Sequence, residues 1–179
     1  MTTPTEIPSL NSLDYIPYLD ENGKIPESIQ GKIGVYAIFN SDKNLKYVGY
    51  SRDIYLSLKQ HFIRQNQGCY WLKLQTIDRP SRTILEGIKQ AWIDENGSIP
   101  PGNGEDESIW NDPIQVKPLM TPEEQDQYQK TDEIGQEKLL KQIARRVEEQ
   151  IFAALKARGL QEEIRFNPKL KTSGLLDLK

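Results

Sequence analysis

The sequence has few of the residues that stabilise small secreted or zinc-bound domains. Among its 179 residues there is one cysteine, Cys69, and one histidine, His61. A single thiol forms neither an intrachain disulfide nor a cysteine-based zinc site, so we expect a reducing compartment, the cytoplasm or its stromal equivalent. No apolar run approaches the roughly 20 residues that span a bilayer, which argues against a membrane segment. Residues 1–12 also lack the basic and apolar regions of a secretory signal.

The chain lacks the overall positive charge that is common in nucleic-acid-binding proteins. Its net charge is −3 and its pI is about 5.4. The charge is unevenly distributed, because residues 43–89 carry nine basic and three acidic residues, whereas residues 94–112 carry six acidic residues and no Lys or Arg. The basic middle is either a binding surface or a chance clustering on solvated faces, and the sequence leaves both interpretations open.

Local patterns predict a hairpin followed by alternating helices and strands. Residues 34–40 are rich in strand formers, residues 41–44 have turn chemistry, and residues 45–48 resume as a strand. Ser51 is the candidate N-cap of a helix, whose apolar positions recur at helical spacing: Ile54, Leu58, His61 and Phe62.

A third strand is expected over residues 70–77 and a second helix over residues 83–94. The apolar stripe of this helix is expected to comprise Ile84, Ile88, Ala91 and Trp92. The resulting ββαβα order predicts an α/β (α+β) domain with a small mixed β-sheet and flanking helices.

Composition divides the chain into three parts. We expect an irregular N-terminal arm over residues 1–30, the α/β domain over residues 31–118, and a helical extension over residues 119–179. Tyrosines and an isoleucine of the arm are candidates to pack on the domain: Tyr15, Ile16 and Tyr18.

The extension is predicted to begin with a capping box, in which Thr121 precedes Pro122 and Glu124. Gly135 is expected to separate this first helix from an amphipathic helix over residues 137–158. The apolar stripe of that helix packs either on its own domain or against a second copy or a protein partner. Residues 164–170 are expected to form a short strand, interrupted by Pro168.

Two triplets carry the functional signal: Gly34-Val35-Tyr36 and Tyr47-Val48-Gly49. Their tyrosines are eleven residues apart and fall on neighbouring antiparallel strands of the predicted hairpin. Ser51 to Ile54 (SRDI) then lead into the helix, and His61 comes fourteen residues after Tyr47. This constellation resembles the GIY-YIG nuclease family, with Val at the centre of both triplets.

A closer resemblance is to the nuclease-like N-terminal domain of plant chloroplast monothiol glutaredoxins. It is carried by residues 31–54 (GKIGVYAIFNSDKNLKYVGYSRDI), by Trp92-Ile93, and by the IPPGN segment at residues 99–103. The Cys-Gly-Phe-Ser segment of the glutaredoxin part is absent from this chain.

The resemblance implies an endonuclease that hydrolyses nucleic-acid phosphodiester bonds, with DNA as the expected substrate. A single divalent cation, Mg²⁺ or Mn²⁺, would be held by a Glu of the second helix and would activate water. By the same resemblance, Tyr36 helps to deprotonate the water, Tyr47 orients the site, and His61 takes part in a proton relay.

The chain departs from the family at two positions. The family arginine falls at Ser57, which cannot make a bidentate contact to phosphate. The family glutamate falls near Ala91, so Glu86, about one turn away, is the candidate metal ligand. Arg52 is the candidate to contact phosphate in place of the missing arginine. Three further basic residues suit a nucleic-acid groove: Lys46, Lys59 and Arg64.

Several interpretations stay open. The two tyrosines are ordinary residues for a strand, and Glu86 is an ordinary solvated helix residue. Cys69 is either inert or, as the resemblance to the chloroplast proteins implies, a redox switch. The enzyme hypothesis therefore competes with a catalytically degenerate GIY-YIG-like module that binds nucleic acid or a protein partner. A scaffold protein acting through its acidic flanks is a third class.

Overall fold

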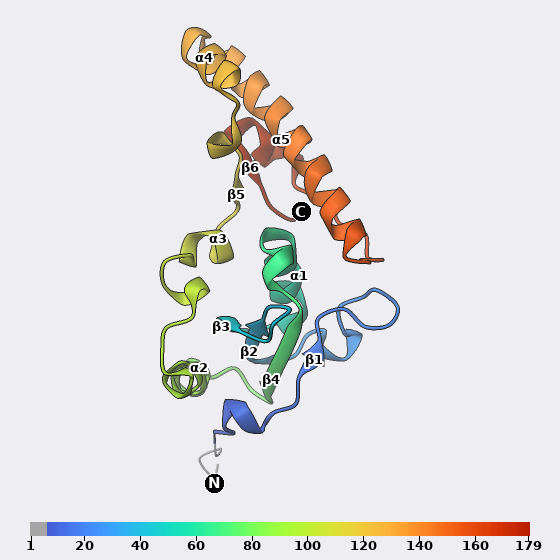
Figure 1. Cartoon of the computed structure of the whole chain (residues 1–179), viewed down its shortest axis with the longest axis vertical. Coiled ribbons are helices and arrows are strands. Elements are labelled where there is room, and N and C mark those ends of the chain that lie inside the picture. Colours follow the sequence, from blue (N-terminus) through green and yellow to red (C-terminus); the bar gives the residue numbers. More distant parts are fainter. Residues whose placement is uncertain (1–6) are drawn as a thin grey trace. The chain divides into compact units, whose positions relative to one another are not determined.

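The computed structural model describes residues 7–179, so the first six residues of the predicted arm lie outside the described part. The chain forms two compact units, of which the first ends at Asn111 and the second comprises Asp112–Lys179 (Figure 1). From the sequence we expected the α/β domain to extend to residue 118. No described helix has the length and apolar character needed to cross a membrane.

The first unit is built on a four-stranded sheet, which confirms the predicted α/β class. Its strands are β1 (Ile16–Pro17), β2 (Ile33–Phe39), β3 (Leu45–Ser51) and β4 (Trp71–Ile77), in the order β1-β4-β2-β3. Every pairing is antiparallel, whereas we expected a mixed sheet with both parallel and antiparallel pairs. The reason is that β3 and β4, joined by a helix, lie on either side of β2 and never pair with each other.

The central strand β2 is covered on both faces. Its alternate residues Val35, Ala37 and Phe39 belong to a core that includes Leu85, Ile88 and Trp92 of helix α2 (Arg82–Asn96). Tyr36 and Ile38 point to the opposite face, where Tyr36 meets helix α1 (Ile54–Arg64). Strand alternation thus assigns the predicted site tyrosine to the α1 face.

Three details of the predicted helices are wrong. Asp53, and not Ser51, is the N-cap of α1, because the Asp53 carboxylate accepts from the Leu56 amide while Ser51 is still part of β3. In α2, the buried stripe contains Leu85 in place of Ile84, which is 41% exposed. Capping by Ser81 starts this helix one residue earlier than expected, at Arg82.

The described part of the N-terminal arm is ordered and docks on both faces of the sheet. It contains the 3-10 helices η1 (Leu10–Ser12) and η2 (Glu27–Ile29), and β1 extends the sheet beside β4. On the α2 face, the Glu95 carboxylate accepts from the amides of Leu10 and Asn11 at 2.8 Å each. On the other face, buried Tyr18 stacks on Phe62 of α1. Apart from these short elements, the described part of the arm has no regular secondary structure, and Tyr18 packs on the domain as expected.

The edge strand β3 is closed by a segment that follows α2. After η4 (Pro101–Asn103), the Asn103 side chain pairs with Val48 as a further strand would: its Oδ1 accepts from the Val48 amide at 2.8 Å and its Nδ2 donates to the Val48 carbonyl at 2.7 Å. Gly102 permits this approach, since a Cβ there would lie 2.7 Å from the Lys46 carbonyl oxygen. The chain then forms the short helix α3 (Glu107–Asn111), which the sequence did not predict.

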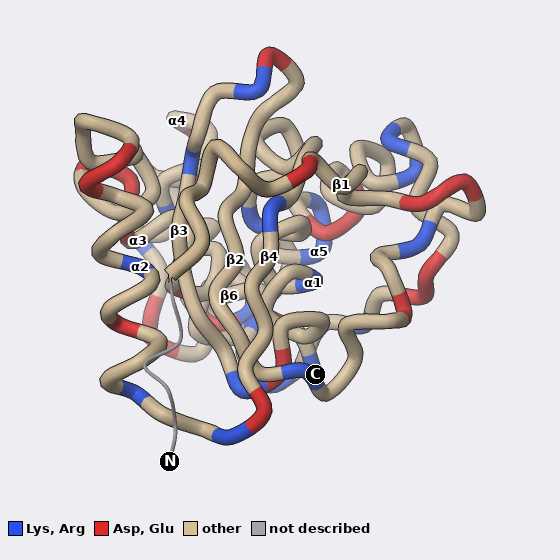
Figure 2. The backbone as a smooth tube through the Cα atoms, turned by 90° about the horizontal axis from the view of Figure 1, so that it is seen from below, with Lys and Arg blue, Asp and Glu red and all other residues tan. Residues whose placement is uncertain are grey.

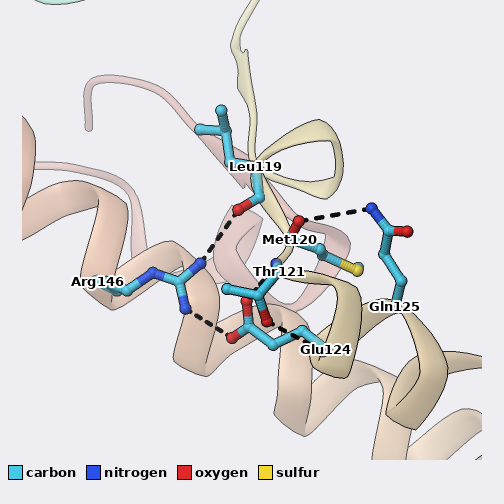
Figure 3. A network of polar contacts seen from close by, with 6 residues as sticks. All are labelled: Leu119, Met120, Thr121, Glu124, Gln125 and Arg146. Atoms are coloured by element: carbon cyan, nitrogen blue, oxygen red, sulfur yellow. Dashed lines mark hydrogen bonds and ion pairs between the residues drawn. The ribbon is translucent and has the colours of Figure 1, made fainter.

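The second unit consists of β5 (Ile114–Gln115), η5 (Lys117–Leu119), α4 (Pro122–Lys130), α5 (Glu133–Ala157), η6 (Pro168–Ser173) and β6 (Leu175–Leu176). The predicted capping box is confirmed, and Figure 3 shows how Arg146 joins it by donating to Glu124 Oε2 at 2.6 Å and to the Leu119 carbonyl at 3.2 Å.

Other expectations for this unit need correction. The break between α4 and α5 falls at Thr131 and Asp132, because Asp132 caps α5 by accepting from the Gly135 amide at 2.8 Å. Gly135 therefore lies inside the first turn of α5. Residues 164–170 form no strand beyond a single bridge at Phe166, since Pro168 starts η6.

Candidate functional site

The structure brings the three predicted catalytic side chains together on the α1 face of the sheet. Tyr36 Oη lies 2.8 Å from His61 Nε2, and the rings of Tyr47 and His61 are 4.6 Å apart. The two tyrosine rings have their centroids 6.1 Å apart. All three residues are at most 7% exposed. Their placement follows from the hairpin register and the helical spacing, while their catalytic roles stay a prediction.

Gly49 makes room for the tyrosine pair. It lies directly across from Tyr36 in the β2–β3 ladder. A Cβ at this position would lie 2.5 Å from Tyr47 Cε2 and 2.8 Å from Tyr36 Oη. The second triplet therefore ends in glycine because two aromatic rings occupy the space that a side chain would need.

The hydrogen bonds of His61 define its tautomer. Its Nδ1 lies 2.9 Å from the Trp110 carbonyl oxygen, which can only accept, so Nδ1 carries the proton. The lone pair of Nε2 then accepts the hydroxyl proton of Tyr36. His61 is thus oriented as a base toward Tyr36.

Burial controls the protonation of this group. It lowers the pKa of His61 to about 3, with the nearby Arg64 charge adding to the decrease and the Trp110 carbonyl opposing it. Burial also raises the pKa of Tyr36 well above its ordinary value, and it raises the pKa of Tyr47. At neutral pH the site therefore contains two phenols and a neutral imidazole.

The C-terminal end of α3 covers the tyrosine site. The Trp110 indole stacks on Tyr47 with centroids 5.4 Å apart and an interplanar angle of 4°. Tyr47 Oη donates to Asn111 Oδ1 at 2.7 Å, and Asn111 Nδ2 donates back to the Glu107 carbonyl at 2.9 Å, which fixes the amide orientation. Two residues that no sequence motif singled out thus make direct contacts with the site.

The predicted nucleic-acid-binding residues do not gather at one place. Arg64, at the end of α1, reaches the site and donates to the carbonyls of Trp110 and Asn111 at 3.4 and 3.1 Å. Arg52 is exposed in the turn before α1, while Lys46 on β3 and Lys59 on α1 are half-buried. The basic residues of the middle segment are distributed over several elements (Figure 2).

Ser57, at the position of the family arginine, lies close to the tyrosine site. Its hydroxyl donates to Ser51 Oγ at 2.7 Å, and Ser51 in turn is bonded to the backbone of Asp53. Burial raises the pKa of Tyr36, and the neighbouring Ser57 hydroxyl opposes part of this rise. The serine therefore links the helix start to the site without supplying charge.

Glu86 lines an open pocket of about 340 Å³ beside Tyr47. Its Oε1 accepts from the Tyr50 hydroxyl at 2.7 Å, and Glu107 lies on the same pocket. Mg²⁺ commonly binds to one or two carboxylates and completes its shell with water and phosphate, and carboxylates of this kind line the pocket. A cage of three or more acidic, His or Cys ligands is not found in residues 7–179.

Sequence reasoning missed Asn103, Trp110 and Asn111. The first falls in the IPPGN segment, which had been noted only as part of a resemblance. The other two lie in the acidic segment, and their contacts depend on α3, which carries no capping motif or apolar periodicity long enough to predict a helix.

Residues 32–90 match the family model described as the GIY-YIG catalytic domain, so this part of the chain is similar to a nuclease-type domain. The chain is also 29% identical, over 101 residues, to the bifunctional monothiol glutaredoxin-S16 of chloroplasts of Arabidopsis thaliana. The alignment covers 54% of this chain and 33% of that protein, so the chain matches about a third of the relative's length.

Proposed function

We propose that the first unit is a divalent-metal-dependent endonuclease domain that hydrolyses phosphodiester bonds of nucleic acid, with DNA as its substrate. The observation that supports this most is the hydrogen bond from Tyr36 to His61 Nε2, with the other imidazole nitrogen committed to the Trp110 carbonyl. This arrangement offers a route for a proton to leave an attacking water, first to Tyr36 and from there to His61.

Tyr36 acts in this proposal as the group that receives the proton of the water, and His61 as the acceptor of the Tyr36 proton. With a pKa of about 3, His61 resists protonation at neutral pH by about 5 kcal/mol, from roughly 1.4 kcal/mol for each pH unit. Binding of an anionic phosphate beside His61 would favour the imidazolium and reduce this barrier. The relay is therefore expected to work only after substrate binds.

The proposal places the cation at Glu86, which lines the pocket beside Tyr47, with water and the phosphate of the substrate completing its shell. A divalent cation at this position, Mg²⁺ or Mn²⁺, would neutralise charge on the phosphate and lower the pKa of a bound water. Glu86 itself is held by the Tyr50 hydroxyl, which orients one carboxylate oxygen and leaves the other to face the pocket or solvent.

The alternative is a module that binds nucleic acid or a protein partner without cleaving. Two observations favour it: Ser57 replaces the family arginine, and α3 covers the tyrosines. A protein partner or a second copy bound through residues 137–158 is a weaker proposal, because part of the apolar stripe of α5 is already in contact with its own unit; Leu140, for example, lies beside Gly174. The proposed setting is the cytoplasm or stroma.

Nicking of supercoiled plasmid with Mg²⁺ or Mn²⁺ tests the proposal. We expect metal-dependent nicking by the wild-type chain and its loss in Tyr36→Phe and His61→Ala. Tyr70→Phe is the matched control, since the Tyr70 hydroxyl donates to Gln67 Oε1. Nicking that persists in both site variants would come from a contaminant. Absence of nicking by the folded wild-type chain would leave the binding module.

A further inference from the structure

Three donors of the tyrosine site converge on oxygen atoms of Trp110 and Asn111, two residues that we call the plug. Tyr47 Oη donates to the Asn111 side-chain oxygen, His61 Nδ1 to the Trp110 carbonyl, and Arg64 to both plug carbonyls. The distances range from 2.7 to 3.4 Å. Three oxygens held by a phenol, an imidazole and a guanidinium reproduce the hydrogen bonding that a phosphate group would accept.

The aromatic part of the plug resembles a nucleobase in its contacts. The Trp110 ring lies parallel to Tyr47 and within 5.7 Å of the His61 ring, and its side chain is only 3% exposed. Unpaired bases stack on aromatic side chains in the same way, whereas bases inside a duplex are already stacked on their neighbours. The plug therefore combines an aromatic ring with oxygens in the positions that a nucleotide would supply.

We propose that Tyr47, His61 and Arg64 form a subsite for one nucleotide with an unpaired base, and that the plug fills this subsite until nucleic acid displaces it. This proposal rests on the proposed function, because it names the substrate class of the same site. The phosphate of the nucleotide replaces the plug oxygens, and its base replaces the Trp110 indole on Tyr47. Single strands and unpaired ends or flaps are the substrates that can supply such a nucleotide.

Arg64 has the geometry to supply the cationic contact that Ser57 lacks. Residues 57, 61 and 64 recur at helical spacing, which places them on one face of α1. Burial dominates the pKa changes of Tyr36, Tyr47 and His61, and the charge of Arg64 acts on all three groups as well. Glu107, whose charge also bears on Tyr47, belongs to α3 and would leave with the plug.

The test measures binding of the full chain to a labelled single strand of thymidine nucleotides, by fluorescence anisotropy at low salt with a chelator present. Asn111→Ala removes the acceptor for Tyr47, and we expect it to bind the strand about five- to tenfold more tightly than wild type, the ratio that corresponds to one hydrogen bond. Ile109→Ala is the control, because this neighbouring side chain is 49% exposed, and its affinity should not change. In the double variant that combines Asn111→Ala with Arg64→Gln, we expect the increase in affinity for the strand to disappear.

Several outcomes overturn the proposal. It fails if Asn111→Ala unfolds cooperatively like wild type and binds the single strand no more tightly than wild type. It also fails if Ile109→Ala shows the same increase in affinity, or if Asn111→Ala increases the affinity for a blunt hairpin duplex as much as that for the single strand. Trp110→Ala removes the aromatic ring of the plug, and the affinity of this variant for the single strand is a second test when the variant folds like wild type. If the wild-type chain nicks DNA but Asn111→Ala binds the single strand no more tightly, the proposed function stands and the plug proposal is rejected. If Asn111→Ala binds the single strand more tightly but neither it nor the wild-type chain nicks DNA, the plug proposal stands and the proposed endonuclease activity is rejected.

Discussion

Replacing Gly49 by Ala tests the packing of the tyrosine pair most directly. The new Cβ would lie 2.5 Å from Tyr47 Cε2, whereas carbon atoms pack best at about 3.5 Å, so the Tyr47 ring must retreat by about 1 Å. Trp110 stacks on that ring, and Tyr36 is fixed by its bond to His61. Because neither ring can move without losing a contact, we expect a destabilisation of about 1–3 kcal/mol, typical of an overpacked core.

Gly87→Ala is the matched control with the opposite expected sign. Gly87 is exposed in the middle of α2, and nothing lies within 4 Å of the position of its added Cβ. The substitution should therefore stabilise the first unit by about 0.5–1 kcal/mol, the difference in helix propensity between Gly and Ala.

Urea unfolding followed by tryptophan fluorescence measures both changes. The three tryptophans, Trp71, Trp92 and Trp110, all belong to the first unit, so their signal reports the unfolding of this unit. A Gly49→Ala variant within about 0.5 kcal/mol of wild type, the range of ordinary surface substitutions, would show that the rings do not occupy the space as described. A destabilising Gly87→Ala would contradict the reasoning for the control.

Three further predictions concern other parts of the chain. Asn103→Ala should destabilise the first unit by about 2 kcal/mol, because two hydrogen bonds to the Val48 backbone are lost at roughly 1 kcal/mol each. Urea unfolding measures this change, and Asn96→Ala, whose amide donates to the Ser98 carbonyl two positions away, serves for comparison. His61 has a pKa of about 3 in the folded chain and 6.5 when exposed. The free energy of unfolding therefore has its full contribution from His61 above pH 6.5, and this contribution falls by about 1.4 kcal/mol for each unit as the pH decreases toward 3. The imidazole NMR signal of this single histidine should accordingly stay constant between pH 8 and 5, on the order of two units above its midpoint, and a midpoint near 6.5 would refute its burial. Thr121→Ala should cost about 1 kcal/mol by removing the cap of α4, with Thr172→Ala expected to change little, as calorimetry of the chain can check.

The sequence by itself determined the local structure of the first unit. Strand propensity and turn chemistry predicted the β2–β3 hairpin, and helical spacing predicted α1 with Ile54, Leu58, His61 and Phe62 facing inward, all of which are buried. The tyrosine spacing together with this hairpin placed Tyr36 and Tyr47 on neighbouring strands. These features depend on residues within a few positions of one another, so periodicity and propensity can reveal them.

Helix boundaries and N-caps were harder to predict from the sequence, because they depend on competition between neighbouring groups. Asp53 and Ser51 are both good N-cap residues, and the choice fell to Asp53 because β3 pairing extends through Ser51, opposite Gly34. The shift of the α2 stripe from Ile84 to Leu85 has the same origin, since the sheet beneath the helix decides which face is buried.

Only the tertiary structure decided what surrounds the site. In the described part of the N-terminal arm, the amides of Leu10 and Asn11 donate to Glu95, a residue about 85 positions away in the sequence. His61 owes its tautomer and low pKa to burial beneath Trp110, 49 positions away in the sequence. Asn103 and Asn111 act on β3 and Tyr47 through side chains that no short-range pattern connects. Contacts between residues far apart in the chain fix the protonation and the covering of the site, and they arise only when the whole unit has folded.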